Sequence, residues 1–256
     1  MFPIRDHNPS GRTPYVVYTL MAINILIHFL YSGLLTQSDS FEMYRHYAVI
    51  PALVSDGIGL ETLLTSIFLH GGFMHLAGNM LFLWIFGDNL EDEMGHLPFL
   101  AFYLVSGIGA GLLHVAAAPG SAVPLIGASG AIAGVMGGYL LLFPKARVDI
   151  LLILIVFFRI FSIPAWVMLG LWLALQFLGG IGSDPNAGGV AYWAHAGGFF
   201  VGMILTAPLW LRRGGPKFWD RTHGHPPHPE PEYRFSSSRI PRVRRKKQGH
   251  PGPWGR

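Results

Sequence analysis

Cysteine is absent from the 256-residue chain, and charged residues make up only 12% of it. Soluble domains usually carry about 25% charged residues, so this chain has half the usual load. Without cysteine it can form neither a disulfide framework nor a thiolate metal site, and the redox compartment stays open. The scarcity of charge, beside 51% hydrophobic residues, favours one unit that crosses a membrane several times over one or two soluble domains.

Six stretches are predicted to cross the membrane as helices, because a crossing needs about 20 mainly apolar residues. They are Tyr15–Leu35, Leu63–Phe86, Leu97–Ala117, Gly127–Phe143, Ile163–Leu178 and Ala191–Leu211. The apolar stretch 149–161 is interrupted by Arg159 and followed by Pro164, so we expect an interfacial lead-in to the fifth crossing. The predicted fold class is therefore an all-α, polytopic membrane protein, with a six-helix bundle over residues 15–211.

The long segment 36–61 is predicted to be a loop on the outer face of the membrane. Its aromatic residues either dip into the lipid interface or belong to an ordinary exposed loop. The first apolar run is too long for a cleavable signal peptide and lacks an A-x-A cleavage site. No Arg/Ser-rich transit segment precedes it, which favours a bacterial plasma membrane over an organelle.

Lys and Arg are distributed unevenly, with twelve of the eighteen after residue 211. Six crossings place residues 1–14, the basic residues after the fourth crossing and residues 212–256 on one side, which predicts cytoplasmic termini by the positive-inside rule. Residues 212–256 are rich in Pro, His, Ser and Arg, and we expect a disordered tail. Its basic cluster is predicted to contact anionic lipid rather than nucleic acid.

Polar side chains inside the predicted helices are few, and five of them lie at one depth near the outer face. His70, His75 and Asn79 fall in the second crossing, Ser129 opens the fourth and His195 opens the sixth. Polar and ionisable groups inside a membrane are costly, which makes them functional hypotheses. His75 and Asn79 share one helix face, and Ser129 lies in a first helical turn, where backbone N–H groups are free.

Two stripes of small residues are predicted to bring the fourth and sixth crossings together. They are Gly130, Gly134 and Gly138 on one helix and Ala194, Gly198 and Gly202 on the other. Facing stripes of this kind let helix backbones pack closely in lipid, which would bring Ser129 within reach of His195. A serine beside a neutral imidazole is an activated nucleophile, and no Asp or Glu lies at that depth. The pattern therefore predicts a Ser–His dyad rather than a triad.

Each of these motifs has a simpler interpretation when it is taken alone. A serine between glycines in a membrane helix is more often a packing feature than a nucleophile. His28 and His114 belong to no motif, and we expect both to be structural. The segment GIGAGLL at 107–113 is similar to a phosphate-binding loop, but no strand precedes it and helix packing is expected.

At these residues the chain resembles the rhomboid family of intramembrane serine proteases. The segments that carry the resemblance occur in the family's order: HGGFMHLAGNMLFLWIFGDNLED (70–92), GASGAIAGVMGGYLLLFP (127–144) and AHAGGFFVG (194–202). The resemblance implies a six-helix bundle with a water-accessible cavity open to the outer face. It also implies that Ser129 is the nucleophile and His195 its general base.

The resemblance further implies an oxyanion hole formed by Asn79, His75 and the backbone N–H of Ser129. His70 matches an accessory histidine near the cavity, and Glu91 matches a structural acidic residue. The chain departs from the family where an aromatic residue often packs on the histidine, because that position is Ala133. What braces the His195 ring is therefore not predicted.

We predict an intramembrane serine endopeptidase that cleaves the transmembrane helices of single-pass membrane proteins, without a metal or cofactor. The absence of an H-E-x-x-H motif argues against a zinc membrane protease. One alternative is a catalytically inactive rhomboid-like protein that binds the transmembrane helices of its clients. Another is a small transporter or channel, which would be expected to carry paired charges or broken helices at mid-membrane.

Overall fold

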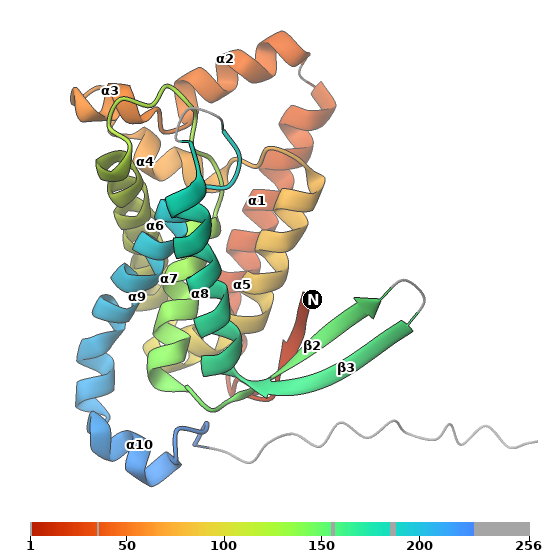
Figure 1. The fold of residues 1–256 in the computed structure, drawn as a ribbon, viewed down its shortest axis with the longest axis vertical. Coiled ribbons are helices and arrows are strands. Elements are labelled where there is room, and N and C mark those ends of the chain that lie inside the picture. The colour runs from red at the N-terminus through yellow and green to blue at the C-terminus, as the bar shows by residue number, and fades with distance from the viewer. Residues whose placement is uncertain (1, 35, 155–156, 185–187, 228–256) are drawn as a thin grey trace, which may run out of the picture.

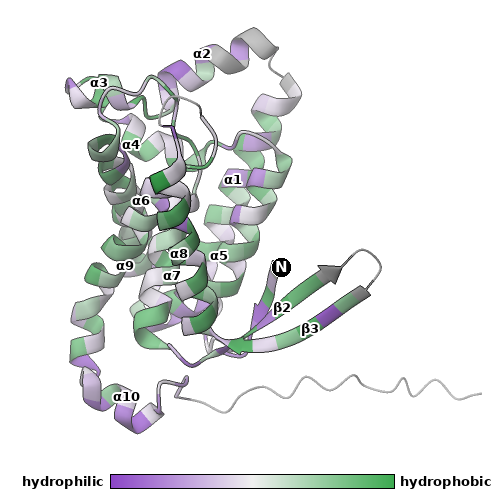
Figure 2. Cartoon of the chain, in the orientation of Figure 1, coloured by the Kyte–Doolittle hydropathy of each residue, from purple (hydrophilic) through white to green (hydrophobic). Residues whose placement is uncertain are grey.

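The computed structural model describes residues 2–34, 36–154, 157–184 and 188–227, and most of this part of the chain is helical (Figure 1). The main bundle contains α1 (Tyr15–Leu34), α5 (Phe73–Met94), α6 (His96–Ala117), α7 (Ser129–Leu142), α8 (Ala165–Gly182) and α9 (Tyr192–Arg212). Within the described residues, α1, α6, α8 and α9 are long and apolar enough to cross a membrane, and a bent pair ending in α5 makes a fifth crossing if the pair is counted as one span. Figure 2 shows apolar residues along most of these helices. The predicted polytopic helical bundle is confirmed.

Helix α7 is the short central helix of the bundle. Its 14 residues extend about 21 Å at a rise of 1.5 Å per residue, less than the ~30 Å of a bilayer core. Nearly all of its residues are buried, and it packs against α5, α6, α8 and α9. Because α7 is short and enclosed, its first residue, Ser129, lies inside the bundle.

The predicted small-residue stripes form the contact between α7 and α9. A Cβ added at Gly198 would collide with the carbonyl oxygen of Gly130, and one at Gly202 would collide with the backbone of Gly134. Only residues without a side chain permit this spacing between the two backbones. The close approach of the fourth and sixth predicted helices is therefore confirmed.

The second predicted crossing, Leu63–Phe86, is wrong as a continuous helix. A short helix α4 (Thr62–Thr65) and the turn η1 (Ser66–Phe68) end before His70, and α5 then starts at Phe73. The two helical pieces meet at an angle of 95°. Two consecutive glycines separate them, and glycine is a poor helix former. His70 therefore lies in the bend, outside α5.

Glu91 lies near the end of α5 and is buried. Its carboxylate accepts hydrogen bonds from the backbone N–H groups of Val16 (2.9 Å) and Val17 (2.8 Å) at the start of α1. A negative charge at a helix N-terminus satisfies free donors and the helix dipole. Glu91 thus ties α5 to α1, which is the structural role that was expected of it.

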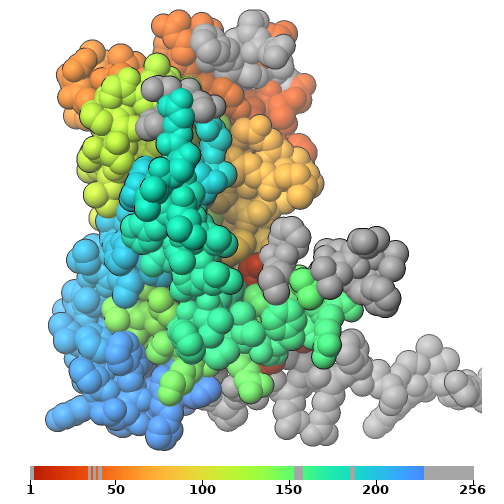
Figure 3. Space-filling model, in the orientation of Figure 1, coloured from red at the N-terminus to blue at the C-terminus, as the bar shows by residue number. Residues whose placement is uncertain are grey.

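Residues 149–161, predicted to lead into the fifth crossing at the membrane interface, belong to a β-hairpin, and this secondary structure was not predicted. Strands β2 (Arg147–Leu154) and β3 (Phe157–Pro164) pair antiparallel, and β1 (Phe2–Asp6) pairs with β2 to complete a sheet of order β1-β2-β3. The segment is rich in Val, Ile and Phe, which favour strands. Figure 3 shows the hairpin projecting from one side of the bundle. The fifth predicted crossing consequently starts at Ala165 rather than at Ile163.

Asp149 joins the three strands through its carboxylate. It accepts hydrogen bonds from Arg5 Nε (2.6 Å) on β1 and from Ser162 on β3, and His7 Nε2 lies 2.9 Å from its Oδ1. Burial opposes ionisation of Asp149, but the hydrogen bonds from Ser162, Arg5 and His7 outweigh it and hold the pKa below its ordinary value. The ionised carboxylate therefore stabilises the sheet.

Asp6, at the end of β1, connects this sheet to the bundle. The hydroxyl of Tyr139 on α7 donates to Asp6 Oδ2 at 2.7 Å. Burial raises the pKa of Asp6 from 3.8 to about 8 against the effect of this hydrogen bond, and the Asp88 carboxyl adds to the rise. Asp6 therefore favours its protonated form in the folded protein.

Replacing Asp6 with asparagine is expected to flatten the dependence of stability on pH. The unfolded chain releases this proton near pH 3.8, whereas the folded protein holds it to about pH 8. The stabilisation is therefore complete below pH 3.8 and is lost as the pH rises through about 8. Between pH ~5 and ~9 the wild type should lose about 4 kcal/mol relative to Asp6→Asn. Thermal unfolding in detergent at a series of pH values measures this loss, and Asp220→Asn, at an exposed position, is the control. The same dependence of stability on pH in Asp6→Asn and wild type would contradict the prediction.

The predicted disordered tail, residues 212–256, is wrong in its first part. Arg212 ends α9, and α10 (Pro216–Thr222) follows directly. Phe218 is buried, and Trp219 Nε1 donates to the carbonyl oxygen of Leu141 at 3.0 Å. These two aromatic side chains bury enough apolar surface to hold the segment against the base of the bundle. Residues 228–256, with most of the basic cluster, lie outside the described residues.

The predicted outer loop, residues 36–61, contains α2 (Gln37–Tyr47) and α3 (Pro51–Ser55). Helix α2 starts with a capping box, in which the Thr36 and Asp39 side chains each accept a backbone N–H. Segment 36–61 also reaches the candidate site, because Val49 pairs with Leu125 just before α7.

Candidate active site

The segment that leads into α7 holds Ser129 in a fixed position. Leu125 exchanges two backbone hydrogen bonds with Val49 (2.7 and 3.1 Å), and the N–H of Gly127 donates to the carbonyl oxygen of Ser66 at 2.9 Å. Gly127 has a φ of 124°, which residues with a side chain rarely adopt. A Cβ at Gly127 would also lie 2.8 Å from the ring of His75. Gly127, two residues before Ser129, thus permits both the turn into α7 and the close approach of His75.

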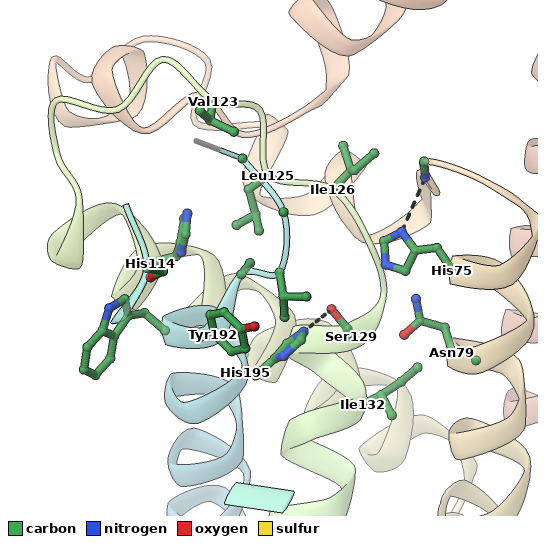
Figure 4. Close-up of a pocket in the computed structure, with 18 of the residues that line it drawn as sticks. His75, Asn79, His114, Val123, Leu125, Ile126, Ser129, Ile132, Tyr192 and His195 are labelled. Carbon is green, nitrogen blue, oxygen red and sulfur yellow. Dashed lines mark hydrogen bonds between the residues drawn. The ribbon is translucent and has the colours of Figure 1, made fainter. Parts of the chain in front are cut away.

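Ser129 and His195 meet across the contact between α7 and α9. Ser129 Oγ lies 2.8 Å from His195 Nε2 (Figure 4). Both residues lie in the first turn of their helices, which start at Ser129 and Tyr192. The structure therefore brings together the two residues that the sequence paired through its glycine stripes.

Two residues of α8 contact the other side of the His195 ring. Gln176 Oε1 lies 2.8 Å from His195 Nδ1, and the Trp172 and His195 rings have centroids 5.8 Å apart with planes at 33°. These contacts brace the imidazole, a role that the aromatic residue missing at Ala133 would have had. Sequence reasoning missed both residues. The available signal was Gln176 itself, a polar side chain inside an otherwise apolar helix.

Asn79 and His75 lie on α5 and line the same cavity as Ser129 (Figure 4). The side-chain nitrogen Nδ2 of Asn79 is buried and, within the described part of the chain, has no hydrogen-bond partner. His75 Nδ1 is 3.4 Å from the backbone N–H of Gly71. An unpaired buried amide costs about 1–3 kcal/mol. A bound group with an acceptor atom would remove that cost.

His70 is separated from this group, behind His75. It is fully buried and does not line the cavity, and its ring centroid lies 5.1 Å from that of His75. Its backbone N–H donates to Tyr31 Oη at 2.9 Å, Tyr31 donates back to its carbonyl oxygen, and His28 Nδ1 lies 2.8 Å from Tyr31 Oη. His70 thus supports the bend that positions His75, and His28 has the structural role expected of it.

His114 on α6 was expected to be only structural, but it lines the cavity (Figure 4). Its Nδ1 is buried and has no partner among the described residues. Sequence reasoning could not assign His114 to the site because no motif surrounds it. It adds a polar group to the wall opposite α5.

A cavity of about 640 Å³ lies over the serine–histidine pair. Its walls come from α5, α6, α7, α8, the start of α9 and the loops that include residues 123–126 and 188–191. Ser129, His195, His75 and Asn79 all line it among apolar side chains. No group of three or more His, Asp or Glu in the described part of the chain could hold a metal ion.

This arrangement can transfer a proton and stabilise a negative charge. A neutral imidazole can accept a hydroxyl proton at Nε2, the atom that lies beside Ser129 Oγ, and a serine that loses its proton in this way is a nucleophile. The first turn of α7 presents backbone N–H groups and the positive end of the helix dipole. With the unpaired amide of Asn79, these donors suit an oxyanion that forms beside Ser129.

Known proteins of similar sequence are rhomboid proteins. A family model described as the Rhomboid domain matches residues 59–212. Rhomboid protein 1, mitochondrial, of Saccharomyces cerevisiae is 31% identical over 196 residues, which are 74% of this chain and 51% of the relative. Rhomboid protease GluP of Bacillus subtilis is 30% identical over 204 residues, 79% of this chain and 36% of the relative. RHOMBOID-like protein 5 of Arabidopsis thaliana is 33% identical over 150 residues, 59% and 44% of the two chains.

The chain spans about half the length, or less, of these curated relatives. The matched region 59–212 is more than half of the chain and contains helices α5 to α9, with every residue of the candidate site. The chain belongs to the rhomboid family.

Proposed function

We propose that the chain is an intramembrane serine endopeptidase in which Ser129 is the nucleophile and His195 is its general base. The observation that supports this best is the 2.8 Å contact between Ser129 Oγ and His195 Nε2 inside a membrane bundle. The name of the Bacillus subtilis relative, a rhomboid protease, is in agreement with this chemistry.

In the proposed reaction, Ser129 Oγ attacks the carbonyl carbon of the scissile peptide bond while His195 Nε2 takes its proton. The oxyanion of the tetrahedral intermediate receives hydrogen bonds from the Ser129 backbone N–H, Asn79 and His75. The C–N bond then breaks, and His195 gives its proton to the leaving amine. A water molecule, deprotonated by His195, hydrolyses the resulting ester and releases the carboxylic acid and the serine.

The proposed substrates are the transmembrane helices of single-pass membrane proteins. A helix pairs and shields its own peptide groups, so the substrate must unwind locally before a carbonyl group can reach Ser129. Residues that weaken a helix, such as glycine and proline, are expected to favour cleavage nearby. The cut is expected near the outer end of the substrate helix, because the site lies at the start of the short helix α7.

The chain is an integral membrane protein, and we propose the bacterial plasma membrane as its location, with both termini in the cytoplasm. The basic residues flanking the predicted crossings support this orientation. Anionic lipid is proposed to bind the basic residues of 228–256. Labelling of single cysteines introduced at positions 10 and 220 of this cysteine-free chain in intact cells tests the orientation. Labelling by an impermeant reagent would contradict it.

The test of the proposed function uses purified protein in liposomes with a fluorescent single-pass substrate. We expect cleavage within the substrate helix, and a fluorophosphonate should attach to Ser129 alone and stop the reaction. Labelling at another serine with loss of activity would contradict the assignment of the nucleophile. A folded protein that binds the substrate helix but neither cleaves it nor reacts would favour the catalytically inactive, helix-binding alternative.

Asn79→Ala is expected to lower kcat about 100-fold and to leave KM nearly unchanged. The amide of Asn79 would act on the oxyanion, which exists only in the transition state and the intermediate, so ground-state binding should not depend on it. Asn79→Asp keeps the shape but replaces the donor with an acceptor, and it should lose at least as much activity. Steady-state kinetics in liposomes measures both variants. Wild-type kcat in folded Asn79→Asp would contradict a role in the oxyanion hole.

A further inference from the structure

A buried amide lies behind the imidazole of His195, on the side away from Ser129. Gln176 Oε1 is 2.8 Å from His195 Nδ1, and Ser129 Oγ is 2.8 Å from His195 Nε2. Gln176 is buried, although it belongs to a helix whose outer face is apolar. We propose that Gln176 is a positioning residue that completes a Ser129–His195–Gln176 array; this rests on the proposed protease function.

The backbone of α8 fixes which end of the Gln176 amide faces His195. Gln176 Nε2 donates to the carbonyl oxygen of Trp172, one turn earlier, at 3.0 Å. A carbonyl oxygen only accepts hydrogen bonds, so the nitrogen must point toward Trp172 and Oε1 toward His195. An acceptor at Nδ1 requires that Nδ1 carry the proton of a neutral imidazole. His195 Nε2 is then left with its lone pair directed at the Ser129 hydroxyl.

The same contact stabilises the charged state that the reaction requires. When His195 takes the proton of Ser129, both ring nitrogens carry hydrogen, and Nδ1–H still donates to the Gln176 oxygen. No carboxylate hydrogen-bonds this ring among the residues that the structure describes. A neutral amide suits this position because a carboxylate buried in a membrane bundle would carry a much larger desolvation cost. Gln176 thus orients the ring at a lower cost than an Asp.

Trp172 limits the motion of the ring in a different way. Its indole lies beside the imidazole, with ring centroids 5.8 Å apart, and also beside Phe199 at 6.1 Å. This contact restricts rotation but supplies no acceptor to Nδ1. The two effects are separable, because only Gln176 determines which nitrogen carries the proton.

The experiment compares wild type with Q176M and Q176E, and with L175M as a control at the neighbouring, lipid-exposed position. Methionine keeps the length of the side chain but lacks the oxygen, whereas glutamate keeps an acceptor. Q176M is expected to lower kcat and the rate of fluorophosphonate labelling about 10- to 100-fold, with KM nearly unchanged. Q176E should recover most of this loss, and L175M should behave as wild type.

Wild-type kcat in folded Q176M, or equal losses in Q176M and Q176E, would overturn the inference. If Q176M does not fold, Q176E decides through the pH dependence of kcat/KM, because its added negative charge stabilises the imidazolium and moves the acid limb to higher pH. The cavity is also lined by the titratable residues His75, His114, Tyr192 and Asp184. They are the same in all variants, so they do not explain a difference in the acid limb between variants. An unmoved acid limb would overturn the inference.

A spectroscopic measurement separates this inference from the proposed function. ¹⁵N-histidine spectra resolve the tautomer of His195, which is assigned by its loss in His195→Ala. Wild type should show one tautomer with the proton on Nδ1, and Q176M should show a mixture. The same mixture in both would overturn the role of Gln176. If wild type neither cleaves nor labels, the proposed function fails, and these spectra still test Gln176.

Discussion

Ser129→Ala and His195→Ala should each abolish proteolysis almost completely, and the double variant should be no worse than either one. Without the imidazole the hydroxyl is not deprotonated, and without the hydroxyl the imidazole has no nucleophile to activate. Residues that act as one unit lose about 10⁶-fold in kcat when either is removed, and the losses do not multiply. The donors around the cavity remain, so a residual rate about 10³-fold above water is expected.

The measurement is kcat/KM of the three variants in liposomes, with their folding checked by thermal unfolding. Ser106→Ala is the matched serine control, because Ser106 is buried on α6 and its hydroxyl does not line the cavity. His46→Ala, on the exposed surface of α2, is the histidine control. Both controls should keep wild-type activity. Losses that multiply in the double variant would mean that Ser129 and His195 act independently.

The meeting of Ser129 and His195 was predictable because its cause lies in short sequence patterns. Gly130 and Gly134 on one helix, and Gly198 and Gly202 on the other, are spaced four residues apart, and this spacing places each pair on one face. In lipid, such faces pack against each other more closely than any others. Ser129 and His195 lie next to these stripes on the two helices, so the close packing of the backbones brings their side chains together.

The contact between Gln176 and His195 was not predictable from such a pattern. It depends on the rotation of α8, whose apolar residues give little indication of which face turns inward. The strand pairing of Phe2 with Leu151 was also hidden, because the partners are far apart in sequence and neither stretch alone determines a sheet. The bend of 95° before α5 was similarly hidden, because the contact of Tyr31 with His70 connects the bend to α1, which is far away in sequence.

Gly198→Ala is expected to destabilise the protein and to lower its activity at the same time. The new methyl group would collide with the carbonyl oxygen of Gly130 and would lie 3.1 Å from the Cβ of Ala110. Backbone atoms cannot move aside as a flexible side chain can, so α7 and α9 must separate, at a cost of about 3 kcal/mol. Gly130 follows Ser129 directly, and Gly198 lies one turn after His195. A displacement of about 1 Å between the reacting groups lowers the rate about 100-fold.

Gly170→Ala provides the matched control, since it makes the same chemical change in helix α8. A Cβ at Gly170 would meet no heavy atom within 4 Å, and alanine is favoured over glycine in a helix by about 1 kcal/mol. This variant should unfold at the same temperature as wild type or slightly higher, with unchanged kcat. Thermal unfolding and steady-state kinetics of the two variants then separate packing from helix propensity. If Gly198→Ala lost stability but kept kcat, the spacing of α7 and α9 would not determine the geometry of Ser129 and His195. The contacts of His195 with Trp172 and Gln176 on α8 would then have to hold the ring in place by themselves.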